Sequence, residues 1–467
     1  MPAESSPERP NILFVLCDDL GINDLRCYGR HDHRTPHLDR LAEQGTRFTC
    51  AYACQPICSA SRAGLLTGLH PARLHLTTFL PGRPDGPSQR VLHPEIALNV
   101  PLSVKTLPRY FSELGYATGL IGKWHIGSEN GPARHGFQHV FHPGDGMETE
   151  PSETEGGKAE YLLTRETLRF IEANRDRPFL AYLGHYTPHI PYSARPDLVA
   201  RNAGAFEPVY AALIETLDDT IGLLLRRLDE WGLAERTIVV FTSDNGGLHV
   251  PEGHHARVTH NTPFRAGKGF NYEGGMRVPL IVRWPGRVPA GRVVDAPVSN
   301  TGWIPTLLEM AGAPVPDGLD GRSFAAGLLG GEFADEPVFW HFPHYTNQGG
   351  RPSGAVRDGR WMLVEHYDED KAELYDLETD VSQREDLAAL HPERVEVLRA
   401  ALARWREENG AQSNVPNPDC NEALFRRLYV EVDPSRFDPL AADDDEWRRM
   451  AAWRRIMDRP SEWNGAD

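Results

Sequence analysis

Short apolar runs that end in polar residues alternate with helical segments over most of the chain. Strands are predicted over residues 11–19 (NILFVLCDD), 46–53 (TRFTCAYA) and 116–122, and residues 178–192 and 236–247 each predict an apolar strand followed by a polar loop. Helices are predicted over residues 36–45, 103–115 and 210–232, where apolar positions recur at helical spacing. This alternation predicts an α/β fold with a large, mostly parallel central sheet flanked by helices.

The pattern changes past about residue 335. Residues 336–345, 353–367 and 372–380 are typical of short antiparallel strands separated by turns, and residues 392–410 are typical of a helix. A chain of 467 residues is also longer than a single hydrophobic core usually supports. We therefore expect a large domain over residues 1–335 and a smaller C-terminal α+β domain over residues 336–467, with a short antiparallel sheet.

Composition and charge narrow the classes of partner. No window is apolar for long enough to span a bilayer, and a formal net charge of -17 argues against a nucleic acid or an anionic membrane surface. The N-terminal residues lack a basic segment followed by an apolar signal core, so we expect a cytoplasmic protein. A signal removed ahead of residue 1 would instead place it in the periplasm or outside the cell.

Polar side chains follow the predicted strands at several points along the chain. In parallel sheets, sites form at the carboxyl ends of the strands, so these residues are expected at one rim. They are Asp18, Asp19, Lys123, His125, His185, His189, Asp244 and Asn245.

Four of these residues offer only oxygen donors. Asp18, Asp19, Asp244 and Asn245 suit calcium or magnesium better than zinc. The six cysteines show no spacing typical of a disulfide framework or a structural zinc site, which favours reduced thiols.

Six motifs, in this order along the chain, carry a resemblance to a known family. The sequence is similar to the type I, formylglycine-dependent sulfatases of the alkaline phosphatase superfamily from about residue 10 to residue 310. The motifs are PNILFVLCDDLG, CSASRAGLLTG, GLIGKWHIG, TPHIPY, TSDNGG and GKGFNYEGGMRVPLIVRWPG. The resemblance implies an arylsulfatase-type hydrolase that cleaves a sulfate monoester, with a sulfated carbohydrate as the natural substrate and aryl sulfates also accepted.

The resemblance assigns the central role to Cys58. In the family this cysteine is oxidised to formylglycine by a maturation enzyme, which makes a formylglycine-generating enzyme an expected partner. One hydroxyl of the hydrated aldehyde attacks sulfur, and the other later helps to expel sulfate and regenerate the aldehyde. Ala60 stands where proline is usual in the family.

The resemblance also implies roles for the other site residues. Residue 58, together with Asp18, Asp19, Asp244 and Asn245, would bind one divalent cation, usually calcium and sometimes magnesium. Arg62 and Lys123 would steady the formylglycine hydrate, and His125 would be the base for sulfate expulsion. Lys268 and His189 would contact sulfate and the leaving oxygen, with His189 favoured as the acid and the division between the two left open.

Two alternatives accompany this interpretation. Phosphonate monoester or phosphate diester hydrolases of the same superfamily share the nucleophile and similar metal ligands. A noncatalytic binding protein is disfavoured because every expected site residue is present. Asn245 directly after Asp244 also disfavours a two-zinc phosphatase, which needs a histidine there.

Residues that would recognise the rest of the substrate are harder to identify. The stretch between Asn245 and Lys268 contains four histidines that are candidates for the substrate pocket, and the smaller domain contributes three further candidates. These residues are His249, His254, His255, His260, His344, Tyr345 and Arg351.

Overall fold

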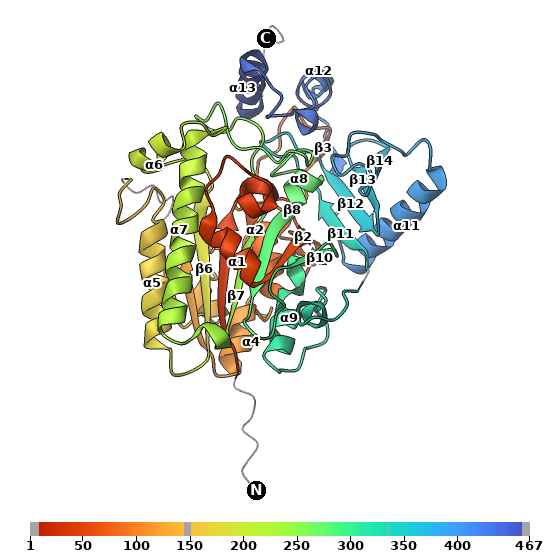
Figure 1. Ribbon diagram of the computed structural model, residues 1–467. Helices are drawn as coiled ribbons and strands as arrows, with labels where there is room; N and C mark the ends of the chain where they lie inside the picture. The colour runs from red at the N-terminus through yellow and green to blue at the C-terminus, as the bar shows by residue number, and fades with distance from the viewer. Residues whose placement is uncertain (1–8, 144–150, 335, 460–467) are drawn as a thin grey trace.

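The computed structural model describes residues 9–143, 151–334 and 336–459 and is built on a nine-stranded sheet (Figure 1). The strand order is β10-β2-β8-β7-β1-β6-β4-β5, and β9 pairs with β2. The strands are β1 (Asn11–Asp18), β2 (Thr46–Tyr52), β4 (Ala117–Gly122), β5 (His139–Phe141), β6 (Phe179–Pro188), β7 (Thr237–Ser243), β8 (Arg277–Arg283), β9 (Arg292–Val294) and β10 (Val298–Ser299).

The middle of the sheet is parallel, as predicted. Strands β7, β1, β6 and β4 run side by side in parallel, whereas β8 is antiparallel to both β7 and β2. The prediction of a large, mostly parallel sheet is therefore confirmed.

Helices cover both faces of this sheet. They are α1 (Pro36–Gln44), α2 (Cys58–Thr67), α3 (Pro71–Leu74), α4 (Leu107–Glu113), α5 (Glu160–Ala173), α6 (Pro196–Arg201), α7 (Pro208–Glu230), α8 (Glu273–Met276), α9 (Trp303–Met310) and α10 (Ala325–Leu328). Strand β1 shows why two layers form, because alternate side chains point to opposite faces. Phe14 packs in the core beneath α2, α4 and α9, and Val15 packs in the core beneath α1, α5 and α7.

A second, four-stranded antiparallel sheet lies beside the first. Its strands are β11 (Val338–Phe342), β12 (Ser353–Asp358), β13 (Trp361–His366) and β14 (Lys371–Asp376), in that order. One face buries Leu398 and Leu402 of α11 (Pro392–Glu408), and the other shares a core with Tyr52 and Met276. The short antiparallel sheet and its helix agree with the expected α+β architecture.

The C-terminal segment covers one end of the molecule. Helices α12 (Glu422–Arg426) and α13 (Asp444–Asp458) lie beyond the loops at that end of the large sheet (Figure 1). A two-residue pair, β3 (Val91–Leu92) with β15 (Val415–Pro416), ties this segment to the large sheet's loops. Within the described part of the chain, no helix has both the length and the apolar character that a membrane span requires.

Arg265 joins the loop before α8 to the smaller sheet. Its side chain is 5% exposed, and its Nη1 donates to Tyr375 Oη at 2.7 Å and lies 3.4 Å from Glu373 Oε2. Its Nη2 donates to Ser435 Oγ at 2.7 Å, and its guanidinium stacks 3.7 Å from the centre of the Tyr272 ring. One buried cation therefore connects three segments that are far apart in sequence.

Replacing Arg265 with methionine should lower the free energy of unfolding by about 3 kcal/mol, because Glu373 would lose a buried partner. Urea unfolding followed by tryptophan fluorescence measures the change. The matched control is Arg360→Met, which removes a half-exposed cation paired with Asp376 on the same sheet and should leave stability almost unchanged. Equal effects of the two substitutions would contradict the importance of the Arg265 junction.

Candidate active site

The predicted strand-end residues meet at one rim of the large sheet. Because β7, β1, β6 and β4 are neighbouring parallel strands, the residues that follow them are brought together. Asp19 and His125 have positive φ angles of 65° and 60°, which turn the chain out of the strand direction. The expectation for His185 is wrong, because β6 continues to Pro188 and His185 is fully buried inside it.

Helix α2 brings Cys58 and Arg62 to the same rim. All ten residues of α2 are buried, and Cys58 is the first of them. Arg62 follows four positions later, so the two side chains lie on the same face of the helix. Small residues such as Ala60 and Gly64 allow this helix to pack closely on every side.

Lys268 reaches the rim on an irregular loop that is fixed by its own backbone. The Lys268 amide donates to Gly247 O at 3.0 Å, and the Gly269 amide donates to Pro56 O at 2.8 Å. The loop is therefore attached both to the segment after Asn245 and to the segment before Cys58.

Three carboxylates are each paired with a cation. Lys123 Nζ lies 2.6 Å from Asp18 Oδ2, and Lys268 Nζ lies 2.7 Å from Asp19 Oδ2. Arg62 Nε donates to Asp244 Oδ2 at 2.8 Å. Each of these carboxylates is at most 2% exposed, so the protein places three carboxyl groups and three basic side chains in a largely dry site.

Burial and pairing set the protonation states. Burial raises the pKa of Asp18, but Lys123, His189 and Arg62 outweigh it and hold that pKa well below its ordinary value. Burial raises the pKa of Asp244 to about 7 against the opposing effect of Arg62. Burial also lowers the pKa of Lys268, but Asp19 outweighs burial and the pKa lies well above its ordinary value. Asp18 is therefore ionised and Lys268 is charged.

The two histidines differ in their hydrogen bonds. Burial, with Lys123, lowers the pKa of His125 to about 2, so its ring is neutral. His125 Nε2 lies 3.4 Å from Leu80 O, and its buried Nδ1 has no hydrogen-bond partner among the described residues. His189 bonds to Ile190 O through Nδ1, which leaves Nε2 facing Asp19 Oδ2 at 3.6 Å.

The donor atoms of this rim fit one metal ion. Ligand atoms of Asp18, Asp19, Cys58 and His189 all lie within 4.8 Å of one another. The buried atoms Asp18 Oδ1 and Asn245 Oδ1 accept no hydrogen bond from any described residue, as expected of oxygens reserved for a cation. The Asp244 oxygens are engaged by Arg62 Nε and the Asp19 amide.

His189 is thus close enough to join the metal ligands, a role that sequence analysis did not assign to it. The available signal was its position after β6, a strand adjacent to the one that carries the two aspartates.

Most of the further substrate-pocket candidates are engaged in structural hydrogen bonds. His249 bonds through Nε2 to Pro434 O, and His344 bonds through Nε2 to Thr77 Oγ1 at 2.7 Å. Tyr345 and Arg351 both bond to Asp368. These contacts join distant loops and give no support to a role in reading substrate.

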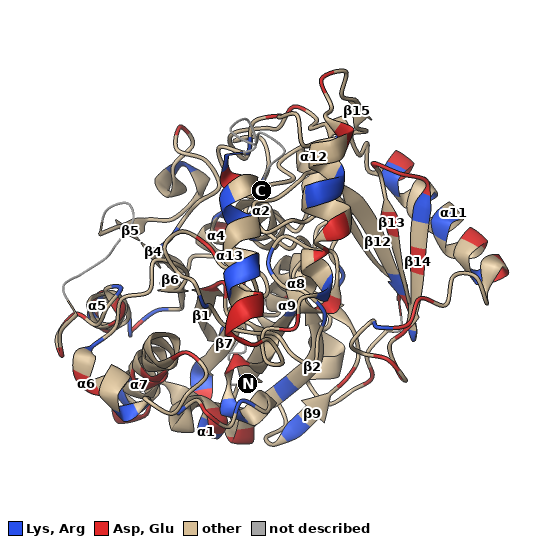
Figure 2. Ribbon diagram, turned by 90° about the horizontal axis from the view of Figure 1, so that it is seen from above, with Lys and Arg blue, Asp and Glu red and all other residues tan. Residues whose placement is uncertain are grey.

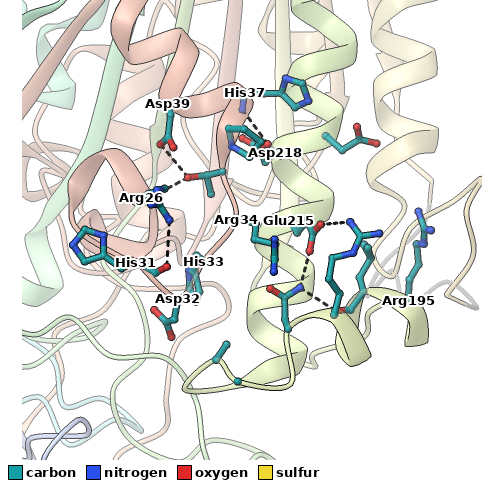
Figure 3. Close-up of a pocket in the computed structure, with 18 of the residues that line it drawn as sticks. Arg26, His31, Asp32, His33, Arg34, His37, Asp39, Arg195, Glu215 and Asp218 are labelled. Carbon is teal, nitrogen blue, oxygen red and sulfur yellow. Dashed lines mark hydrogen bonds and ion pairs between the residues drawn. The ribbon is translucent and has the colours of Figure 1, made fainter.

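A cavity of about 890 Å³ lies between α1, α6 and α7, away from this rim (Figure 3). None of the catalytic candidates lines it. Some of its polar groups pair with one another: Arg201 with Glu215 at 2.6 Å, and the Asp218 carboxylate with the backbone amides of His37 and Leu38.

A mostly parallel sheet with acids, lysines and histidines at its carboxyl rim is an arrangement typical of α/β enzymes. Residues 10–313 match the model of the family described as Sulfatase, and residues 266–407 match that of "N-sulphoglucosamine sulphohydrolase, C-terminal". The chain belongs to the sulfatase family.

Curated relatives and solved structures agree with this membership. The chain is 33% identical to N-acetylgalactosamine-6-sulfatase of Canis lupus familiaris, covering 73% of this chain and 70% of that protein. It is 32% identical to steryl-sulfatase of Mus musculus, covering 74% of this chain and 69% of that protein. The crystal structure of Ps i-CgsB in complex with k-i-k-neocarrahexaose is 26% identical, with a TM-score of 0.74 over 92% of this chain and 100% of that one.

The comparisons also separate the two hydrolase interpretations. Phosphonate monoester hydrolase of Agrobacterium radiobacter has a TM-score of 0.65 over 88% of this chain and 100% of its own, but at 19% identity it shares only the fold. The named sequence relatives are sulfatases. The protein is a sulfuric ester hydrolase that acts on sulfate monoesters.

In unprocessed protein the Cys58 thiol should react very slowly with alkylating reagents. Burial raises its pKa to about 11, although Lys268 and Lys123 oppose this, so at pH 8 only about one molecule in a thousand carries the thiolate. Native iodoacetamide labelling in EDTA, followed by peptide mass spectrometry, should show much less label at Cys58 than at the half-exposed Cys420. Faster labelling of Cys58 would contradict the buried, uncharged thiol.

Proposed function

We propose that this sulfatase desulfates a sulfated saccharide, using formylglycine made from Cys58 and one calcium ion, with magnesium as the alternative ion. The observation that carries the proposal is the position of Cys58 within 4.8 Å of donor atoms from two aspartates and a histidine. A formylglycine-generating maturation enzyme is then the partner that the protein requires.

The environment of residue 58 supports its modification. As a buried thiol with a raised pKa, Cys58 is a weak nucleophile. Formylglycine at this position would supply a hydrated aldehyde as the nucleophile. Ala60 is fully buried in α2, so the residue that replaces the family's usual proline is part of the helix packing.

The charge balance supports a requirement for a cation. Three carboxylates and three basic side chains leave the rim close to neutral, which offers little net attraction for a sulfate ester. A divalent ion held by Asp18, Asp19, Asp244, Asn245 and residue 58 would make the site positive and polarise a sulfate oxygen. Arg62, Lys123 and Lys268 then contribute the fixed positive charges that stabilise the equatorial oxygens of the transition state.

Two histidines are placed to move protons. His125 is neutral and keeps an unpaired Nδ1, which suits a base that takes a proton from residue 58. His189 Nδ1 faces Ile190 O and Nε2 faces Asp19 Oδ2, so both ring nitrogens meet oxygen acceptors, as the imidazolium requires. Burial and Lys268 lower the pKa of His189, and Asp19 opposes them. We assign the Nε2 proton of this imidazolium to the leaving oxygen, a role that excludes Nε2 from the metal ligands.

The choice of a saccharide rests on the relatives. The dog enzyme is named for N-acetylgalactosamine, and Ps i-CgsB was crystallised with k-i-k-neocarrahexaose. Steryl-sulfatase, named for a sterol, is nearly as similar, so a sterol sulfate is the comparison substrate.

The direct test is to express the protein with a formylglycine-generating enzyme and to examine the peptide that contains residue 58 by mass spectrometry. We expect an aldehyde in place of the thiol, together with turnover of 4-nitrophenyl sulfate and of N-acetylgalactosamine 6-sulfate. Cys58→Ala is the control without a nucleophile. Full turnover by that variant would refute the proposal. Faster turnover of a sterol sulfate than of the sulfated saccharide would refute the choice of a saccharide as substrate.

Calcium should stabilise the protein through Asp18. At a free concentration 100 times the dissociation constant, calcium should add about 2.7 kcal/mol to the free energy of unfolding. Asp18→Asn should lose this gain, because it removes a charge from the ligand set. Asp218→Asn should retain the gain, because Asp218 lies in α7 and its buried carboxylate accepts backbone amides at the start of α1. Differential scanning fluorimetry after EDTA treatment measures both, and an undiminished gain in Asp18→Asn would contradict the metal assignment.

A further inference from the structure

The loop that carries His189 has no regular secondary structure. Residues 189–195 follow β6 and belong to no helix or strand. His189 bonds through Nδ1 to Ile190 O, a carbonyl of the same loop. The direction of the other ring nitrogen, Nε2, therefore depends on the position of this loop's backbone.

The first residue of α5 and the segment before it contact the end of β6 and this loop at three points. Glu160 Oε1 accepts a hydrogen bond from Thr187 Oγ1 at 2.7 Å. Lys158 Nζ donates to Pro191 O at 3.1 Å. Gly157 packs so closely on Ser193 O that a β-carbon at residue 157 would lie 1.6 Å from that oxygen. The contacts begin two residues before His189 and end four residues after it.

His255 makes a further contact with the same loop. The backbone amide of Tyr192 donates to His255 Nε2 at 3.0 Å, and the two rings lie 4.5 Å apart. Burial, with His254 and Lys158, lowers the pKa of His255 to about 4, so Nε2 remains an acceptor at neutral pH. The loop is thus held between residues 157–160 and His255.

The two ionisable side chains that make these contacts, Lys158 and Glu160, are unusual for a purely structural role. Glu160 is fully buried and Lys158 is 3% exposed. Besides the Thr187 hydroxyl, the Glu160 carboxylate accepts the Lys158 amide at 2.8 Å. Charged groups lose hydration on burial, and apolar side chains of similar size often give equal stability. What these groups provide instead is direction, because one bond fixes Thr187 at the end of β6 and another fixes Pro191 O in the His189 loop.

We propose that Lys158, Glu160 and Thr187 are positioning residues that hold His189 for proton donation to the leaving oxygen. This inference rests on the acid role given to His189 under the proposed function. It predicts that activity is lost selectively. A leaving oxygen that is a weak base departs without a proton, whereas a more basic one needs a proton from the acid, so a misplaced His189 should slow only substrates with a basic leaving oxygen.

The test compares kcat/KM for 4-nitrophenyl sulfate and 4-methoxyphenyl sulfate, which differ mainly in the basicity of the leaving oxygen. Thr187→Val removes the hydroxyl that binds Glu160 and should lower kcat/KM about tenfold for the methoxy substrate, since small displacements of a catalytic group are costly. The nitro substrate should change less than about twofold. Thr187→Ser keeps the hydroxyl and should restore both values.

Matched variants separate positioning from stability. Thr167→Val removes a buried hydroxyl in α5 that bonds only within the helix, to Leu163 O at 2.8 Å, and should leave both substrates unaffected. Lys158→Met removes an independent contact with the loop and should reproduce the selective loss even if Thr187→Val folds poorly. In a His189→Ala background, Thr187→Val should have no additional effect on the methoxy substrate.

Two results would overturn the inference: an equal loss for both substrates with the formylglycine content unchanged, or no loss in folded Thr187→Val and Lys158→Met. A different result tests the proposed function on which the inference rests. If His189→Ala itself affected both substrates equally, His189 would not be the acid, and the positioning role would fail with it. Failure of the positioning role alone would leave His189→Ala selective for the basic leaving group.

Discussion

The structure depends on compensating three carboxylates that are buried side by side at the carboxyl ends of β1 and β7. Without partners, such a cluster would have to take up protons or unfold, because the desolvation of each charge is expensive. Arg62, Lys123 and Lys268 provide the compensation from a helix, a strand end and a loop. Under the proposed function the same cations would hold an anionic ester, so one set of side chains would meet both the requirement for stability and the requirement for catalysis.

This compensation explains features far from the rim. Helix α2 is buried on every side, which its small residues permit, and this places the Arg62 guanidinium against Asp244. The Lys268 loop has little secondary structure, so Arg265 attaches it to the smaller sheet and to the segment around Ser435. Seen from above, α13 and its charged residues lie over the central strands of the large sheet (Figure 2). The C-terminal part of the chain therefore contributes order to the reaction centre without supplying any of its proposed catalytic groups.

The sequence predicted the elements and the rim because both follow from local patterns. A run of apolar residues that ends in Asp18 indicates a buried strand and the edge at which its last side chain lies. The sequence could not predict pairings across long separations. The bonds of Tyr345 and Arg351 to Asp368 could not be predicted from the sequence, and the bond between Glu160 and Thr187 has no signal in either segment. The sequence wrongly places His185 after its strand, because the extended backbone of β6 continues through three further residues to Pro188.

The charge at the rim also bears on how one fold serves several esters. A sulfate monoester, a phosphonate monoester and a phosphate diester each carry a single negative charge near neutrality, so a site made positive by one divalent ion attracts all three. Selection must then come from the leaving group and from the shape of the pocket around it. In the arrangement proposed above, the region beside the leaving oxygen would be formed by the His189 loop and the residues that hold it. Those residues lie in segments whose polar contacts no simple motif encodes, which is why the chemistry of this sulfatase is more readily inferred from its sequence than the identity of its alcohol.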